Sequence, residues 1–233
     1  DQNHELRELV KFLLGPLSGF TPVYGTGPAL LCEQAVYFGH WGVIPSELFH
    51  GRLPVSRLDL PAGCPVPHEY PKVPFLSVFT SMFLHIGVIH LAVNLYFGWS
   101  WAVPMERVLG HARFLIVYIL SGVAGSAASV LGHDVVSAGA SGALFGLMGA
   151  TLVTIRLRLG SWQAVWAHPP IRQVIISGVL WLVAGPFMGF DSFAHGGGLL
   201  AGGAITWGLL TNNRVKLIAA YAGVALLVAA SLR

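Results

Sequence analysis

The sequence contains few charged residues. Asp, Glu, Lys and Arg together make up 10% of its 233 residues, whereas hydrophobic residues make up 55%. A soluble domain carries about 25% charged residues, so this chain has too few solvated side chains to cover its outside. We therefore expect its outer surface to contact the lipid bilayer. The formal net charge is +3, but the basic residues form no stripe, and we expect no nucleic-acid partner.

Cysteine is also scarce. The chain has only Cys32 and Cys64, which excludes a disulfide framework and provides neither zinc-site nor haem-site spacing. Whether the two residues pair is left open. The start of the chain lacks a signal-peptide pattern, and no repeat or low-complexity tract is present. We therefore expect one membrane domain.

Six intervals lack charged residues and are near or above the roughly 20 residues that cross a bilayer as a helix. A charged side chain at the bilayer centre costs about 2.5 to 3.5 kcal/mol, so such intervals mark candidate spans. The intervals are 73–105, 114–133, 135–155, 173–190, 192–213 and 217–232. Residues 159–171 are uncharged too, but their Trp and Pro content favours an interfacial connection. The sequence thus predicts an all-α polytopic membrane protein with six visible transmembrane helices.

The basic residues indicate how these spans are oriented. Lys and Arg accumulate on the cytoplasmic side of membranes. Alternate connections hold Arg107 and Arg113, then Arg156, Arg158 and Arg172, then Arg214 and Lys216. The two remaining connections, around Asp134 and Asp191, hold no basic residue, so we place them on the non-cytoplasmic face. The simplest location is a bacterial cytoplasmic membrane.

Two spans that enter from this face begin with a residue suited to catalysis. Ser141 follows Gly139 and Ala140 near the start of one, and His195 lies near the start of the other. A serine becomes nucleophilic when a base lies within about 2.6 to 3.2 Å. Small residues allow helices to approach closely, and both spans have them: Gly142, Gly146 and Gly149 in the first, Gly198, Gly202 and Gly203 in the second. We therefore expect Ser141 and His195 to meet.

Further polar residues lie in the first span. His90 and Asn94 are four residues apart and share one helical face. With backbone N–H groups at the start of the Ser141 helix, they are candidates for an oxyanion hole. We expect His85 to be structural. Asp191, four residues before His195, is expected to be a solvated loop carboxylate rather than a third member of a triad.

A metal site formed by His85, His90 and His195 is a weaker alternative, because no carboxylate or thiolate completes it. If Ser141 is instead the nucleophile of a hydrolytic reaction, water must reach it. We therefore expect a polar cavity that opens to the non-cytoplasmic face.

These residues together resemble the rhomboid family of intramembrane serine proteases. The matching motifs are His85 to Asn94 as His-x-x-x-x-His-x-x-x-Asn, Glu106 with Gly110, Gly139 to Gly142 as Gly-x-Ser-Gly, and Ala194-His195-x-Gly-Gly. They occur in family order and cover about residues 41–210. Each motif alone is weak, but the ordered set on successive spans is specific.

The resemblance implies a Ser-His dyad in a rhomboid-like helical bundle. Ser141 would be the nucleophile and His195 the general base and then acid, with His90, Asn94 and the Ser141 backbone N–H forming the oxyanion hole. Gly139 would permit the tight loop before the helix, Gly142 would allow close helix packing, and Phe145 would pack on the His195 ring. The implied substrates are single-pass transmembrane proteins, and no cofactor is required.

The resemblance also suggests a division of the chain. Residues 1–40 would be an N-terminal segment holding a remnant of the family's first span, which is weak or truncated here. Residues 41–72 would form an interfacial loop, 73–212 the catalytic core with family spans two to six, and 215–233 an additional C-terminal transmembrane helix. The loop lacks the Trp-Arg pair by which some members anchor it.

Two other functions compete with the protease. A catalytically silent rhomboid-like adaptor would bind transmembrane helices without cutting them, but such relatives typically lose the serine or histidine that this chain keeps. A small channel or transporter would line its pathway with intramembrane polar residues. Against it, these residues cluster near one face, and no Asp, Glu, Lys or Arg lies within a span.

Overall fold

A computed structural model describes residues 38–39, 41–44, 74–85, 87–133, 136–188 and 190–232. The expectations for Cys32, Cys64 and most of residues 1–72 fall outside these ranges. The described chain is helical, apart from one isolated antiparallel bridge between Val43 and Ser137. The helices are η2 Pro74–Leu76, α5 Ser77–Thr80, η3 Ser81–Phe83, α6 Gly87–Leu109, α7 His111–Gly132, α8 Ser141–Leu159, α9 Trp162–Ala167, α10 Pro169–Ala184, η4 Gly185–Met188, α11 Ser192–Leu210 and α12 Arg214–Ser231.

The interval 73–105 is not one helix, contrary to its reading as a single span. Three short helical turns end at Phe83, the backbone of Leu84 is extended (φ −91°, ψ 147°), and α6 begins only at Gly87. The absence of charge marks an apolar environment but does not require a continuous helix. His85 consequently precedes α6, whereas His90 and Asn94 lie on it.

Three described helices are long and apolar enough to cross a membrane by length and composition: α7, α8 and α12. The helix α10 is apolar but has only 16 residues. The helix α11 contains six glycines besides His195, and α6 contains His90, Asn94, Glu106 and Arg107. These residues lower the mean hydropathy of α6 and α11. The polar residues belong to the candidate site, and the glycines allow close helix packing.

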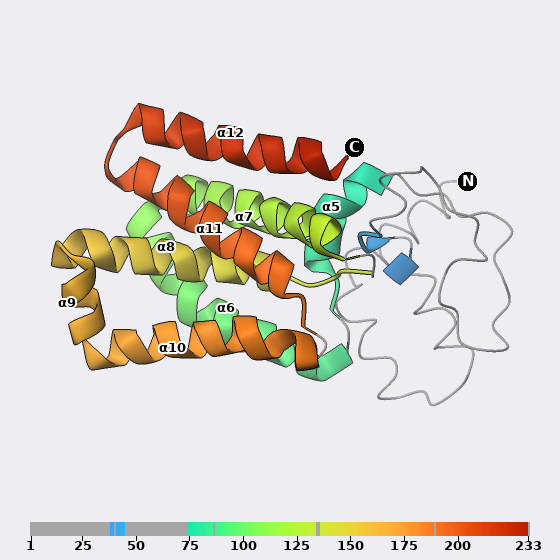
Figure 1. The fold of residues 1–233 in the computed structure, drawn as a ribbon, viewed down its shortest axis with the longest axis horizontal. Coiled ribbons are helices and arrows are strands. Elements are labelled where there is room, and N and C mark those ends of the chain that lie inside the picture. Colours follow the sequence, from blue (N-terminus) through green and yellow to red (C-terminus); the bar gives the residue numbers. More distant parts are fainter. Residues whose placement is uncertain are drawn as a thin grey trace, which may run out of the picture.

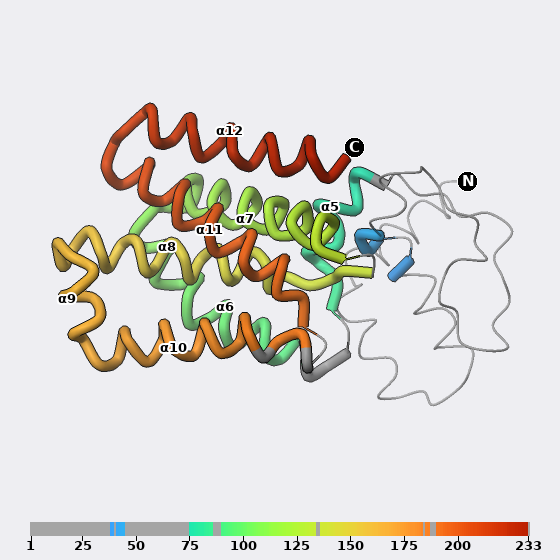
Figure 2. The backbone as a smooth tube through the Cα atoms, viewed as in Figure 1, coloured from blue at the N-terminus to red at the C-terminus, as the bar shows by residue number. Residues whose placement is uncertain are grey.

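The helices form a bundle in which α7, α8 and α11 pack against one another (Figure 1). The helix α6 packs on α8 and α7, and α12 covers α11 and α7. Figure 2 shows the backbone of α11 crossing that of α8, while α9 joins α8 to α10 at the far end of the bundle. The helix α10 contacts α9, η4 and α11, so it lies at the side of the bundle.

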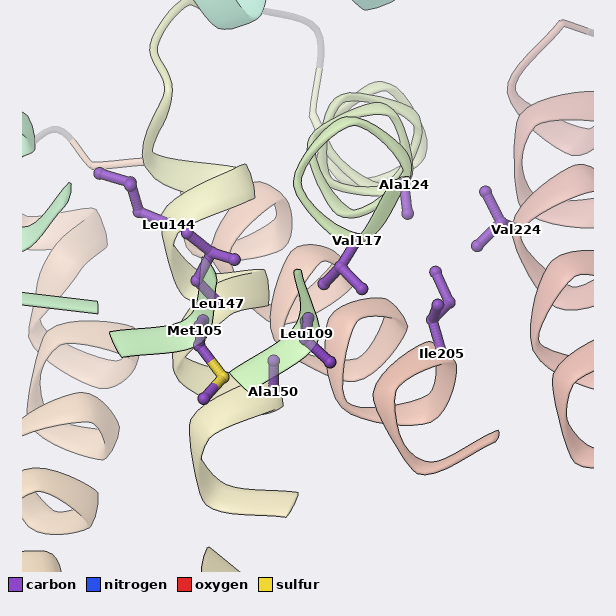
Figure 3. Close-up of a cluster of buried hydrophobic side chains, with 9 residues drawn as sticks. All are labelled: Met105, Leu109, Val117, Ala124, Leu144, Leu147, Ala150, Ile205 and Val224. Carbon is purple, nitrogen blue, oxygen red and sulfur yellow. The ribbon is translucent and has the colours of Figure 1, made fainter. Parts of the chain in front are cut away.

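A buried hydrophobic cluster unites five of the helices (Figure 3). Its members come from α6, α7, α8, α11 and α12, and they are Met105, Leu109, Val117, Ala124, Leu144, Leu147, Ala150, Ile205 and Val224. Among the described residues, α10 contributes none. The buried core of the described chain is therefore formed by the bundle without α10.

Glycines bring α8 and α11 into backbone contact, as the sequence predicted. A Cβ atom built at Gly198 would lie 1.9 Å from the Gly142 carbonyl oxygen, and one at Gly202 would lie 2.2 Å from the Gly146 carbonyl oxygen. Both distances are far below van der Waals contact, so no side chain fits at either position. This approach aligns the first turns of the two helices.

Candidate active site

Ser141 and His195 meet where α8 and α11 begin. Ser141 is the first residue of α8, and His195 lies in the first turn of α11. The distance between Ser141 Oγ and His195 Nε2 is 2.9 Å, within the range that a nucleophile and its base require. The imidazole is buried, with 4% of the residue exposed. The expected contact between the two side chains is therefore present.

The other nitrogen of His195, Nδ1, is buried and has no hydrogen-bond partner among the described residues. No carboxylate therefore orients the ring through this atom. Instead, Phe145 stacks on the imidazole with ring centroids 4.2 Å apart and an interplanar angle of 9°. The edge-to-face contact of Trp101 with Phe145, at 6.2 Å, supports this stack from α6. Packing thus holds the ring that a third polar residue holds in a triad.

The loop before Ser141 requires glycine at position 139. Gly139 has φ +138°, a conformation that residues with side chains rarely adopt. A Cβ atom at this position would also lie 2.8 Å from Cε1 of His90. The Gly139 N–H donates to the Ser81 carbonyl at 2.8 Å. The glycine therefore lets the loop turn tightly while the His90 ring comes close to it.

His90 and Asn94 both lie close to the dyad, and the Asn94 side chain also hydrogen-bonds to the backbone. His90 and Asn94 line a cavity together with Ser141 and His195. The Asn94 amide donates to the His90 carbonyl at 3.0 Å, which occupies one of its two N–H groups. The His85 ring packs against His90, with centroids 5.5 Å apart. His85 therefore supports His90 from the segment before α6.

Two cavities meet at the dyad, and both are lined by His90, Ser141, Phe190 and His195. One, of about 450 Å³, has many polar neighbours, including Ser81, Ser126, His133, Ser137 and Asp191. The other, of about 510 Å³, lies between α6, α8 and α10 and is lined largely by apolar and aromatic side chains such as Phe97, Trp101, Leu144 and Trp181. The serine thus borders two cavities whose other walls differ in polarity.

Asp191 differs from the solvated loop carboxylate that the sequence predicted. Its side chain is only 18% exposed and lies 3.2 Å from Nε2 of His133. One carboxylate oxygen accepts a hydrogen bond from Ser137 Oγ at 2.7 Å, and the other accepts from the Ala194 N–H at 2.9 Å. Among the described residues, no hydrogen bond joins the carboxylate to the His195 ring. The expectation that Asp191 is not a triad member agrees with this geometry, but the expectation of solvation is wrong.

The same surroundings set the acidity of Asp191, which lies in the connection between α10 and α11. Burial acts to raise its pKa, but the interactions with Ser129, Ala194, Ser137 and His133 together outweigh burial, so the pKa is below its ordinary value of 3.8. The folded protein therefore binds this proton more weakly than the unfolded chain does. The carboxylate stabilises the fold above pH 3.8, and this contribution is lost as pH falls through the lower folded-state pKa.

We expect Asp191→Asn to lower the melting temperature of the detergent-solubilised protein most at and above about pH 5, where the parent carboxylate is ionised. The difference between the variant and the parent should shrink as pH falls below 3.8, because the unfolded parent takes up its proton there and the folded carboxylate follows only at its lower pKa. Thermal unfolding of both proteins between pH 3 and 6 measures it. An equal difference at both ends of this range would contradict the assignment.

Sequence reasoning missed Ser137 and His133, which contact Asp191, and Trp101, which supports Phe145. Ser137 is one serine among many, and its role depends on a hydrogen bond to a residue 54 positions away. His133 offered a signal, because it stands at the end of a charge-free interval on the dyad side. Within the described ranges, no three His, Cys, Asp or Glu side chains group as a metal ion would require.

Comparison with known proteins adds independent findings. Residues 74–212 match a family model described as the Rhomboid domain. Rhomboid protease GluP of Bacillus subtilis is 36% identical over 126 residues, which are 54% of this chain and 24% of that protein. RHOMBOID-like protein 6, mitochondrial, of Arabidopsis thaliana is 34% identical over 131 residues, covering 54% and 40% of the two chains.

The similar proteins differ in their named activity. Inactive rhomboid protein 1 of Danio rerio is 30% identical over 149 residues, or 62% of this chain and 17% of that protein. In all three comparisons the match spans less than half the length of the relative. Sequence similarity alone therefore does not distinguish a protease from an inactive relative. The geometry of the site provides the further criterion.

Proposed function

Because the chain belongs to the rhomboid family, we propose that it is an intramembrane serine endopeptidase that hydrolyses peptide bonds in or near the transmembrane helices of single-pass membrane proteins. The observation that carries this proposal is the 2.9 Å contact between Ser141 Oγ and His195 Nε2. A serine and a histidine that served only packing would not require this distance. It is the arrangement in which a base activates a hydroxyl nucleophile.

In the proposed reaction, Ser141 Oγ attacks the carbonyl carbon of the substrate while His195 Nε2 accepts the hydroxyl proton. The tetrahedral intermediate collapses as His195 returns the proton to the leaving amine, which leaves an acyl-enzyme on Ser141. Water then attacks the ester carbonyl, again with His195 as base, and releases the acid product and the free serine. No cofactor takes part.

The oxyanion of both tetrahedral intermediates needs hydrogen-bond donors. The first N–H groups of α8 have no partner within the helix, and the N–H of Ser141 is one of them. We assign His90 and the second N–H of Asn94 to the same hole, since both side chains line the cavity that contains Ser141. Loss of one such donor lowers the rate of a serine protease by about 100- to 1,000-fold.

The two cavities suit the two reactants. The polar cavity, with Ser81, Ser126 and Ser137 in its wall, suits hydrolytic water. The apolar cavity suits a hydrophobic peptide segment that arrives from the lipid between α6 and α10. Between these helices the wall includes the edge-to-face contact of Phe97 with Trp181, whose centroids are 6.4 Å apart. Since α10 contributes nothing to the core cluster, this side of the bundle is the one that yields most easily to a substrate.

The chain is a multi-pass membrane protein, and we propose that α6, α7, α8, α10, α11 and α12 each cross the bilayer. The core would span 73–212, with the additional helix at 215–233. The helix α8 runs about 28 Å from Ser141 to its other end, where Arg156 and Arg158 lie in its last turn. This arrangement supports our proposal that the dyad lies near the non-cytoplasmic face of, in the simplest case, a bacterial cytoplasmic membrane.

The alternative function is a catalytically silent adaptor. The similarity to Inactive rhomboid protein 1 of Danio rerio supports this alternative. An adaptor would use the same apolar cavity to hold a transmembrane helix without cutting it. The contact between Ser141 and His195 argues for the protease, because an adaptor needs neither residue.

Labelling with a fluorophosphonate tests the proposal directly, because only an activated serine reacts quickly with this probe. We expect the purified, folded protein to be labelled, and peptide mapping to place the adduct on Ser141. Heat-unfolded protein should not react. As a matched control, Ser121→Ala removes a buried α7 serine that donates to the Val117 carbonyl and lines neither cavity, and it should leave labelling unchanged. A folded parent that does not react would favour the adaptor.

A further inference from the structure

Asp191 touches both segments that present the dyad. Ser137 lies four residues before Ser141, in the loop that enters α8, and Asp191 lies four residues before His195. One carboxylate oxygen accepts from Ser137 Oγ at 2.7 Å, while the other accepts from the Ala194 N–H at 2.9 Å. The Asp191 carbonyl also accepts from the His195 N–H at 3.1 Å. A single residue thus bridges the loop before the serine and the turn that holds the histidine.

This arrangement exceeds what helix capping requires. An N-cap needs one side-chain oxygen to accept from the first turn, and the Oδ1 contact with Ala194 satisfies that need for α11. The Oδ2 contact reaches a segment 54 residues earlier in the chain. Since a carboxylate hydrogen bond is roughly twice as strong as a neutral one, this contact fixes the loop relative to α11.

The loop from 136 to 140 is held at other points as well. Val43 and Ser137 exchange backbone hydrogen bonds of 3.1 and 3.0 Å, and the Gly139 N–H donates to the Ser81 carbonyl. These contacts bind the loop to segments that precede α6, and none of them reaches α11. Among the described contacts of this loop, the Ser137 side chain therefore provides the hydrogen bond to the element that bears His195.

His133 also contacts the carboxylate. Its Nε2 lies 3.2 Å from Asp191 Oδ1, and its ring contacts Phe193 edge to face at 5.9 Å. The C-terminal end of α7 thus also contacts the carboxylate. The Asp191 side chain is 18% exposed, so these partners, rather than bulk water, satisfy most of its hydrogen-bonding capacity.

We propose that Asp191 is a positioning residue that sets the separation of Ser141 Oγ and His195 Nε2, acting through Ser137 on one side and the first turn of α11 on the other. The proposal rests on the proposed protease function and goes beyond it by assigning a role to a residue outside the dyad and the oxyanion hole. Asp191 takes no part in proton transfer, because its two oxygens bind other groups and Nδ1 of His195 has no partner in the described chain.

The test compares fluorophosphonate labelling rates in a series that separates the two contacts. Ser137→Ala removes the bridge but keeps the α11 cap, and we expect labelling to slow about tenfold or more, because a misplacement of about 1 Å can cost about 100-fold in rate. Ser137→Thr retains the hydroxyl and should restore most of the rate. Asp191→Ala should slow labelling at least as much as Ser137→Ala. Asp191→Asn can still accept from Ala194 and donate to Ser137, so its labelling rate should fall between those of the parent and Asp191→Ala.

A combined Ser137→Ala/Asp191→Ala variant should label no more slowly than Asp191→Ala alone, because the first change removes a partner that the second has already lost. The acid limb of the pH–rate profile should keep its position in Ser137→Ala while the rate falls. Multiplicative effects in the double variant, or parental labelling by Ser137→Ala, would overturn the proposal.

Hydrogen–deuterium exchange separates this proposal from the proposed function. If the parent fails to label, the protease assignment fails, but the bridge is still testable. Ser137→Ala should then speed exchange at the amides of both 136–145 and 191–198, while Ser137→Thr should not. Unchanged exchange in either segment of Ser137→Ala would show that Asp191 does not couple the two segments.

Discussion

Replacement of His195 by alanine should slow hydrolysis of a membrane-protein substrate by about 10,000-fold or more, as loss of the base does in serine proteases that use a triad. The serine would lose the acceptor that now lies 2.9 Å from its hydroxyl. The variant should still fold, because the smaller side chain opens space beside Phe145 without disturbing the backbone contact of α8 with α11. Reconstituted protein and a fluorescent transmembrane substrate provide the measurement.

The Ser141→Ala variant provides the matched comparison. Two residues that act as a unit are not additive, so the double variant should be no slower than either single one. All three variants should still bind the substrate helix, since the apolar cavity remains. Substantial turnover by His195→Ala would mean that another group serves as base, and equal turnover by Ser141→Ala would exclude the proposed nucleophile.

Replacement of Gly198 by valine should have the second-largest effect, because it forces α8 and α11 apart next to the dyad. A Cβ at this position would lie 1.9 Å from the Gly142 carbonyl oxygen, and backbone cannot give way as a flexible side chain does. Overpacking of this kind costs about 1 to 3 kcal/mol. A shift of about 1 Å at the dyad would slow reaction by about 100-fold. Melting temperature and labelling rate should therefore fall together.

The helix offers a control two residues away. A Cβ at Gly196 would have no atom within 4 Å, and alanine is a better helix former than glycine by about 1 kcal/mol. Gly196→Ala should therefore melt no earlier than the parent and keep its labelling rate. If Gly198→Val behaved like this control, the close approach of the two helices would not be what holds the dyad together.

The sequence was most informative where two physical requirements coincided. A serine and a histidine at the starts of apolar intervals are costly unless they have partners, and glycines spaced along both helices provided the means for them to meet. The start of α8 at Ser141 and the contact with His195 followed from these features. The tight loop at Gly139 was expected from the family resemblance, and its φ of +138° agrees with that expectation.

Other features could not be read from local pattern. The break before Gly87 occurs inside an uncharged interval, where neither charge nor hydropathy distinguishes an extended residue from a helical one. The environment of Asp191 depends on Ser137 and His133, which approach it only after α7, α8 and α11 have packed. A carboxylate beside a span looks solvated in sequence, and tertiary contacts alone reveal that it is largely buried.

Because the glycine contact between α8 and α11 does not depend on Ser141 or His195, the fold can persist in evolution after the catalytic residues have changed. Ser141 and His195 can each become a smaller residue without a clash, whereas Gly198 and Gly202 tolerate no addition because the Gly142 and Gly146 carbonyls fill that space. Under the proposed function, a lineage that began from such a chain would lose cleavage by one substitution and keep its architecture. The apolar cavity between α6, α8 and α10 would remain, so catalysis would be lost more easily than binding of a membrane helix.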